Sequence, residues 1–260
     1  MNPLPTSPVP RSRFDGALQI VRYNWPQYAG SVAVVAVALW WLARNPQGAS
    51  VLRAVAWAAA LLSAWWVLAS LAASHWIYDC SPLYRWTWIP DFLPAAPKRW
   101  LNLHAGLDES FATLAQLFPA SSGQVGDFYV AGEMSEPSIQ RAREEQQNAA
   151  PGMRVDPLQL PFTDQSFDTV FLLFAAHELR RAASREAFLR EVRRVLAPGG
   201  TVLLVEHVRD LANFVAFGPG FWHFLPSAEW RRLAGVAELE LVSERRMTPF
   251  VKVMLWRKKP

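Results

Sequence analysis

The sequence contains one cysteine, Cys80, and few charged residues. A single cysteine excludes a disulfide scaffold and a cysteine-rich metal site. Charged residues make up 18% of the 260 positions, below the roughly 25% of ordinary soluble domains. Acidic residues are scarcest at the front, where residues 1–100 hold three Asp and Glu against eight Lys and Arg. The remainder is nearly balanced and offers no basic face, so we expect no nucleic-acid partner.

Long uncharged runs are present instead, at residues 28–43 and 54–74, and the turn-forming segment 44–48 separates them. Each run approaches or reaches the 17–25 residues that cross a bilayer. We therefore expect two transmembrane helices within residues 25–74, preceded by a mobile, proline-rich tail over residues 1–24. The alternative is a pair of buried helices in a soluble helical domain.

Basic residues flank this predicted hairpin on the side of both chain ends: Arg11, Arg13, Arg22, Arg85, Lys98 and Arg99. The positive-inside rule then places both termini in the cytoplasm, and a composition rich in Ala and Arg suggests a bacterial inner membrane. Ten of the 13 tryptophans lie in residues 1–100. Residues 75–97 alternate aromatic and polar side chains, which predicts either an interfacial collar or a segment that packs on the next domain.

From residue 98 the pattern changes to short apolar runs that alternate with helical stretches, as in an α/β domain with a mostly parallel sheet. The expected strands cover residues 100–104, 128–131, 153–155, 169–174, 201–207, 239–244 and 251–256. The expected helices cover residues 110–118, 137–147, 184–196 and 228–237. The last two strands follow each other directly and should form an antiparallel pair.

Ligands of such sheets bind beyond the carboxyl ends of the strands. The residues at those positions are Gly106, Glu133, Asp156 with Pro157, His177, and Glu206 with His207. Each also has a purely structural interpretation, as a turn residue, a solvated loop acid or a helix cap. Their spacing suits no metal, and no serine lies in a nucleophile elbow.

The order of the motifs is more specific. The segment DPLQLPFTDQSFDTV from Asp156, then HEL from His177, EVRRVLAPGG from Glu191 and VEH ending at His207 resembles class I S-adenosylmethionine-dependent methyltransferases. The resemblance covers residues 98–258 and favours the branch that methylates small molecules and lipids, including quinones. It implies a Rossmann-like sheet with an antiparallel last strand and S-adenosylmethionine as the cofactor.

The resemblance also implies residue roles. Glu133 would hold the cofactor ribose, Met134 would flank the adenine, Asp156 with Pro157 would bind the adenine amino group, and Phe174 would lie under the reacting methyl. The first loop departs from the family's acid-x-Gly-x-Gly-x-Gly pattern: Asn102 replaces the acid, His104 stands near the methionine moiety, and only the middle glycine, Gly106, remains.

Methyl transfer is an in-line displacement, and a hydroxyl nucleophile would need a base. His177 and His207 are the candidates, with Glu206 orienting His207. The aromatic stretch 214–225 suggests a lid, or else a simple flap of the core. We expect a membrane-anchored methyltransferase of a hydrophobic or lipid-like small molecule, its oligomeric state left open. The alternative is a non-catalytic, membrane-tethered interaction protein; a dehydrogenase fits less well because its glycine fingerprint is absent.

Overall fold

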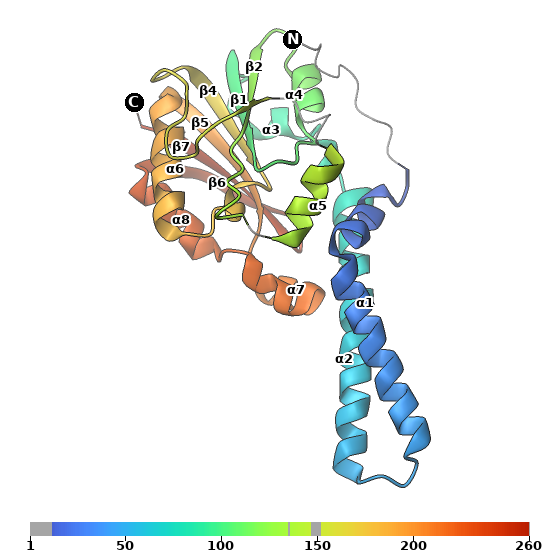
Figure 1. Ribbon diagram of the computed structural model, residues 1–260. Coiled ribbons are helices and arrows are strands. Elements are labelled where there is room, and N and C mark those ends of the chain that lie inside the picture. Colours follow the sequence, from blue (N-terminus) through green and yellow to red (C-terminus); the bar gives the residue numbers. More distant parts are fainter. Residues whose placement is uncertain (1–11, 135, 147–151, 260) are drawn as a thin grey trace.

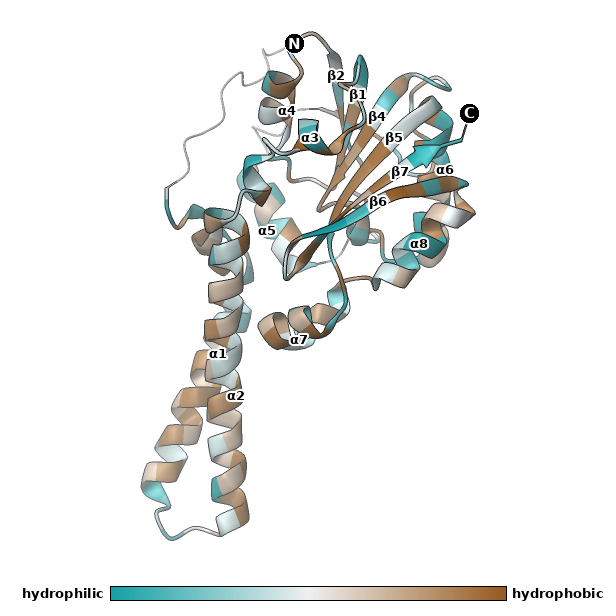
Figure 2. Cartoon of the chain, turned by 180° about the vertical axis from the view of Figure 1, so that it is seen from behind, coloured by the Kyte–Doolittle hydropathy of each residue, from teal (hydrophilic) through white to brown (hydrophobic). Residues whose placement is uncertain are grey.

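A long helical hairpin projects from an α/β domain in the computed structural model, which describes residues 12–134, 136–146 and 152–259 (Figure 1). Helices α1 (Asp15–Arg44) and α2 (Ser50–His75) run side by side in opposite directions. The chain of α2 continues directly into a short π-helix, η1 (Trp76–Cys80). Figure 2 shows that most of the hairpin is hydrophobic along its length.

Helix α1 begins at Asp15, ten residues before the span predicted from residue 25. The cause is a distant side chain: the Asp79 carboxylate accepts hydrogen bonds from the backbone N–H groups of Gly16 at 2.7 Å and Ala17 at 3.0 Å. These are first-turn donors that have no partner inside the helix. Residues 12–24 therefore are not all part of a tail, and residues 1–11 of the predicted tail lie outside the described residues.

The hairpin is also fastened to the domain. Arg141 Nε donates to the backbone carbonyl of Tyr23 at 2.8 Å, and Arg22 pairs with Glu145 at 2.6 Å. Gln19 donates to Glu109 at 3.0 Å. The N-terminal part of α1 thus has a defined position against helix α5 (Pro137–Gln146).

Residues 75–97 pack on the domain, which was the second of the two interpretations from the sequence. The segment folds into η1, η2 (Leu83–Arg85) and α3 (Ile89–Phe92). The side chains of Ile77, Leu83 and Ile89 are fully buried and join the core on one face of the sheet.

The sheet has seven strands in the order β3-β2-β1-β4-β5-β7-β6. The strands are β1 (Arg99–His104), β2 (Ser122–Asp127), β3 (Met153–Arg154), β4 (Phe167–Leu173), β5 (Leu196–His207), β6 (Leu239–Thr248) and β7 (Val251–Lys258). The first five are parallel, whereas β7 is antiparallel to both β5 and β6. This confirms the predicted mixed sheet.

Helices cover both faces of the sheet (Figure 1). They are α4 (Phe111–Leu117), α5, η3 (Ala176–Glu178), α6 (Ala182–Val195), α7 (Leu211–Phe217), η4 (Gly218–His223) and α8 (Ser227–Val236). Strand order reverses between β1 and β4, and such a reversal opens a crevice at the carboxyl ends of the strands.

The second strand was predicted wrongly. It lies at Ser122–Asp127 rather than at residues 128–131. Its sequence reads poorly as a strand because two positions are glycines, and the packing requires both. The Gly123 backbone lies against the Trp100 indole, and a side chain at Gly126 would come within 2.8 Å of Leu103 Cδ2. The acid that ends this strand is therefore Asp127.

Candidate active site

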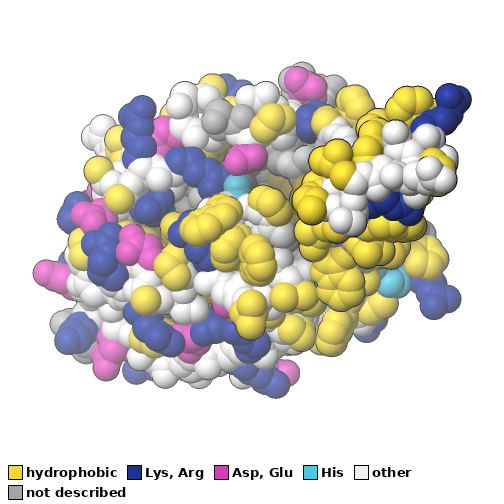
Figure 3. Space-filling model, turned by 90° about the horizontal axis from the view of Figure 1, so that it is seen from below, with side chains coloured by type: hydrophobic (Ala, Val, Ile, Leu, Met, Phe, Trp, Pro, Cys, Tyr) yellow, Lys and Arg dark blue, Asp and Glu magenta, His cyan; other side chains and the backbone are white. Residues whose placement is uncertain are grey.

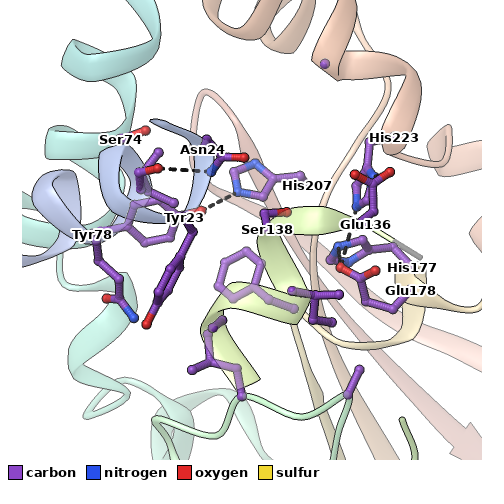
Figure 4. Close-up of a pocket in the computed structure, with 18 of the residues that line it drawn as sticks. Tyr23, Asn24, Ser74, Tyr78, Glu136, Ser138, His177, Glu178, His207 and His223 are labelled. Carbon is purple, nitrogen blue, oxygen red and sulfur yellow. Dashed lines mark hydrogen bonds and ion pairs between the residues drawn. The ribbon is translucent and has the colours of Figure 1, made fainter. Parts of the chain in front are cut away.

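A cavity of about 960 Å³ lies at the carboxyl ends of β1, β4 and β5, between the α/β domain and the hairpin. One end is the loop from β1 to α4, and the other is formed by α1, α2 and η4. Figure 4 shows side chains from the hairpin facing the histidines of the domain across this space. Of the predicted site residues, Asn102, His104, Phe174, His177 and His207 line it.

The β1–α4 loop is held by its own polar side chains. The Asn102 amide donates to both Asp108 and Ser110 at 3.0 Å, and the Gly106 N–H donates to His104 Nδ1 at 3.1 Å. Gly106 is buried with φ +98°, a conformation that favours glycine. The His104 ring therefore closes a tight turn in the loop, and Asn102 orders the start of α4.

Asp127 stands at the end of β2, next to this loop. Its Oδ1 accepts the Tyr129 N–H at 3.0 Å, and its Oδ2 pairs with Arg143 at 2.9 Å. The Arg143 guanidinium lies 3.9 Å from the centre of the Tyr129 ring and covers the open face of Gly106. Sequence reasoning missed Asp127 because it placed the second strand too late.

Four predicted cofactor residues lie elsewhere. Glu133 accepts a hydrogen bond from Ser184 at 2.7 Å, and Met134 is fully buried in the core. Asp156 is exposed at a turn, where it accepts the Leu158 N–H at 2.8 Å, with Pro157 beside it. Among the described residues, the cavity lining contains none of these four. Glu133 was expected to hold the cofactor ribose from the end of the second strand, but that strand, β2, ends at Asp127.

His177 is held between two carboxylates. Its Nδ1 lies 2.6 Å from Glu206 Oε2, and its Nε2 lies 3.1 Å from Glu178 Oε1. Burial alone would favour the neutral imidazole, but the two negative charges outweigh it and raise the pKa of His177 to about 10. At neutral pH His177 is therefore a cation and cannot accept a further proton.

His207 has the opposite environment. Burial, reinforced by the nearby His177 cation, lowers the pKa of His207 to about 3. Its Nε2 forms a 3.0 Å hydrogen bond with the Tyr78 hydroxyl from η1, and its ring stacks on Phe224 with centroids 4.7 Å apart. The predicted pairing is thus corrected: the Glu206 carboxylate contacts His177, not His207.

A cluster of four polar residues in the cavity was not among the predicted site residues, and Figure 4 labels three of them, Glu136, Glu178 and His223. His223 of η4 approaches Glu136 at 3.1 Å and Glu178 at 3.5 Å, and Arg180 contacts the same two carboxylates. The hydrogen bond from His223 lowers the pKa of Glu136. His223 was visible in the aromatic stretch 214–225, but its acidic partners come from segments far away in the sequence.

The cluster also has ligand atoms at metal-binding distance: those of His177, Glu178 and His223 lie within 4.8 Å of one another. Sequence spacing did not indicate this cluster because His223 is 46 residues from His177. The Arg180 guanidinium lies 3.8 Å from Glu178 and places a positive charge beside these ligand atoms. The expectation that the protein binds no metal stays a prediction.

An aromatic wall completes the cavity. Phe174 follows β4 with φ +54° and stacks on Tyr84 with ring centroids 5.7 Å apart. Tyr78 and Trp86 contact the same ring. A flat apolar ligand would find both faces and edges of aromatic rings here.

Comparisons with known proteins agree with this architecture. Residues 112–204 match the methyltransferase domain family. The match begins just after the β1–α4 loop, in which this chain departs from the family pattern. The sequence is 34% identical over 119 residues to a demethylmenaquinone methyltransferase of Thermus thermophilus, covering 44% of this chain and 49% of that protein.

It is also 33% identical over 128 residues to the ubiquinone/menaquinone biosynthesis C-methyltransferase UbiE of Geotalea daltonii, covering 48% of this chain and 51% of that protein. The chain thus spans about half the length of these curated relatives. These matches identify residues 112–204 as similar to a methyltransferase domain.

Solved structures show the same fold. The cyclase SpnF matches with a TM-score of 0.50 and 16% identity over 70% of this chain and 82% of that one. The PH0226 protein of Pyrococcus horikoshii matches with a TM-score of 0.50 and 17% identity, over 69% and 93%. At this identity the likeness concerns the fold alone, and a fold does not define a reaction.

Proposed function

We propose that the protein is a membrane-anchored S-adenosylmethionine-dependent methyltransferase that acts on a hydrophobic, quinone-like small molecule. The observation that carries this proposal is the course of the cavity. It begins at the β1–α4 loop and ends among side chains of the hairpin, so one space joins the cofactor end to the apolar helices. The curated relatives are named as methyltransferases of quinone biosynthesis.

The residues at the cofactor end fit a nucleoside with a charged tail. Asp127, at the end of β2 beside the β1–α4 loop, pairs with Arg143 and is not among the described residues that line the cavity. With Arg143 moved aside, its carboxylate can accept hydrogen bonds from both ribose hydroxyls. The side chain of Arg143 covers the open face of Gly106. Because that side chain is flexible, it can move aside and let a ligand approach the Gly106 backbone. Asp108 and Glu109 line the adjoining wall and can hold the amino group of the methionine moiety.

When bound, S-adenosylmethionine supplies a methyl group on a sulfonium, and the bonding electron pair stays with sulfur. Neither His177 nor His207 is a good proton acceptor at neutral pH, since one is already protonated and the other has a pKa of about 3. This favours attack by a ring carbon rather than by a hydroxyl that must first be deprotonated. The name of one relative, which contains the word C-methyltransferase, agrees with attack by carbon.

Glu178 then has the proton-accepting role. Attack by an aromatic carbon makes that carbon strongly acidic, so a weak base can remove its proton and restore the ring. Glu178 lies 11% exposed at the cavity and is oriented by His177 and His223. The pKa of Glu178 is lowered because His177 and His223 outweigh its burial, which keeps it ionised.

The hairpin supplies the proposed membrane anchor. Helices of this length and apolar composition can cross a bilayer, and only 17% and 11% of their most apolar windows are buried within the protein. A core helix of a soluble protein would be mostly buried. The proposal retains both termini in the cytoplasm of a bacterial inner membrane, from the distribution of Lys and Arg.

The test is mass spectrometry of lipid extracts from cells with and without the gene. We expect one lipid-soluble compound to lose a methyl group's mass in the deletion strain. Re-expression of the wild type should restore it, whereas the Asp127→Asn variant, produced at the same level, should not. Identical extracts from all three strains would refute the proposal.

The non-catalytic alternative also has an observation in its favour. Arg143 pairs with Asp127 and covers Gly106, which are the positions a cofactor would need. In that case the domain would be a tethered interaction module. Binding of S-adenosylmethionine to the purified protein separates the two functions.

A further inference from the structure

The segment formed by α7 and η4 exposes an apolar surface beside the hairpin. Its residues 211–222 carry no charge. The exposed fractions of four side chains are high: Leu211 75%, Phe214 48%, Val215 45% and Trp222 64%. In Figure 3 hydrophobic side chains gather on this underside of the domain, next to the hairpin. A patch of this kind marks an interaction surface.

The hairpin fixes this segment at one level of α2. Trp65 Nε1 donates to the Val215 carbonyl at 3.2 Å, and Trp66 Nε1 donates to the Phe217 carbonyl at 2.6 Å. In Figures 1 and 2 α7 lies across the direction of α1 and α2. A helix in this position would lie in the plane of a membrane that the hairpin crosses.

Polar side chains locate the membrane boundary. On the domain side of the two tryptophans, the hairpin directs Asn24, Gln27, Tyr28, Ser70 and Ser74 into the cavity. On the far side, the helices expose an apolar surface that includes Val37, Val55 and Leu61. The boundary between water and lipid therefore falls near Trp65, at the level of α7.

The length of the hairpin also places the boundary between water and lipid near Trp65. Between Trp65 and the turn, residues 50–65 of α2 extend about 24 Å at 1.5 Å per residue. The hydrocarbon core is about 30 Å thick. An interfacial helix that sinks 5–10 Å into the acyl boundary supplies roughly the missing depth. Arg44 and Arg53, at the turn, then reach the opposite headgroups.

We propose that α7 and η4 form a second membrane contact, with Leu211, Phe214, Val215 and Trp222 inserted into the acyl boundary of the bilayer. This inference rests on the membrane anchoring in the proposed function. Arg209 fits the boundary: it lies 5.1 Å from the Trp222 ring and donates to the Trp222 carbonyl at 2.7 Å, an arrangement suited to headgroup depth.

The consequence concerns the substrate. Residues Phe217, Pro219, Gly220 and Trp222 line the cavity, so the end of the cavity at η4 would lie at the level of the lipid surface. A membrane-resident amphiphile can then place its polar ring in the cavity while its apolar tail stays in the bilayer.

The test uses the full chain with Cys80→Ser, reconstituted in phosphatidylcholine and phosphatidylglycerol vesicles. Single cysteines replace Phe214, Val37 or Val242 and carry an environment-sensitive fluorophore. Val242 is the matched control, an apolar side chain 41% exposed on the edge strand β6. We expect spin-labelled lipid to quench labels 214 and 37 to a similar extent, and soluble iodide to quench label 242.

Iodide quenching at 214 with lipid quenching at 37 would overturn the second contact and leave the anchor intact. Iodide quenching at both 214 and 37 would overturn the anchor and the second contact together. Neither outcome depends on methyl transfer, which the lipid-extract experiment tests separately.

Discussion

At the scale of single residues, the cavity is an electrostatic arrangement of two histidines in opposite states. His177 is flanked by Glu206 and Glu178, whereas His207 is buried among Tyr78, Phe174 and Phe224. The sequence placed both imidazoles at strand ends correctly. It assigned them the same role because their distant neighbours, which decide their charge, are not readable from local pattern.

We predict that His177 remains protonated at pH 8 and that His207 is neutral at pH 5. Side-chain nitrogen NMR of the detergent-solubilised protein measures both, and Glu206→Gln should lower the pKa of His177 because it removes one flanking charge. Since the folded pKa of about 10 exceeds the usual 6.5, the contribution of His177 to stability is complete below pH 6.5 and is lost as pH rises through 10. An ordinary titration near 6.5 would contradict the arrangement.

At the scale of elements, η1 joins the hairpin to the domain. Asp79 caps the start of α1, and Tyr78 of the same turn reaches His207. The close approach requires Gly16, because a β carbon there would collide with Tyr78 and come within 2.7 Å of Asp79 Oδ1. The hairpin therefore forms part of the cavity wall rather than a loose tether.

Gly16→Ala should destabilise the protein by about 1–3 kcal/mol through overpacking. Gly30→Ala is the matched control in the same helix, where a β carbon meets nothing within 4 Å, and it should be neutral or stabilising by roughly 0.5–1 kcal/mol. Thermal unfolding in detergent compares the two. Equal melting temperatures would show that α1 does not depend on this contact.

Strand β2 shows where element prediction stops. The strands β1, β4 and β5 can be recognised from their apolar runs, because both faces of those strands are buried. In β2 the two glycines leave room for the side chains of Trp100 and Leu103 on the neighbouring strand. The local pattern therefore predicts a strand at the next apolar run, residues 128–131. The acid expected at the end of this strand was therefore Glu133, whereas β2 ends at Asp127.

At the scale of the whole molecule, two apolar helices and an α/β domain share one cavity. Charge and periodicity change sharply near residue 98 of the sequence, and β1 begins at Arg99. The sequence did not reveal their junction, which depends on contacts such as Arg141 with Tyr23 and Trp66 with Phe217.

The hairpin makes a prediction at this scale. After cell fractionation the full chain should stay in the membrane pellet through salt and alkaline carbonate washes and should leave it only with detergent. Release by carbonate would mean that the helices lie on a surface or pack within an assembly instead of crossing the bilayer.

The central claim is that the pocket beside the altered glycine loop binds S-adenosylmethionine through Asp127. Calorimetric titration of the cofactor into the full-length protein tests it directly, with Asp127→Asn and Glu133→Gln as a matched pair. Loss of hydrogen bonds to a charged group costs about 1.5–3 kcal/mol. We therefore predict that wild type and Glu133→Gln bind alike and that Asp127→Asn binds at least about tenfold more weakly. Absence of binding by the wild type, or weakening by Glu133→Gln alone, would contradict the account.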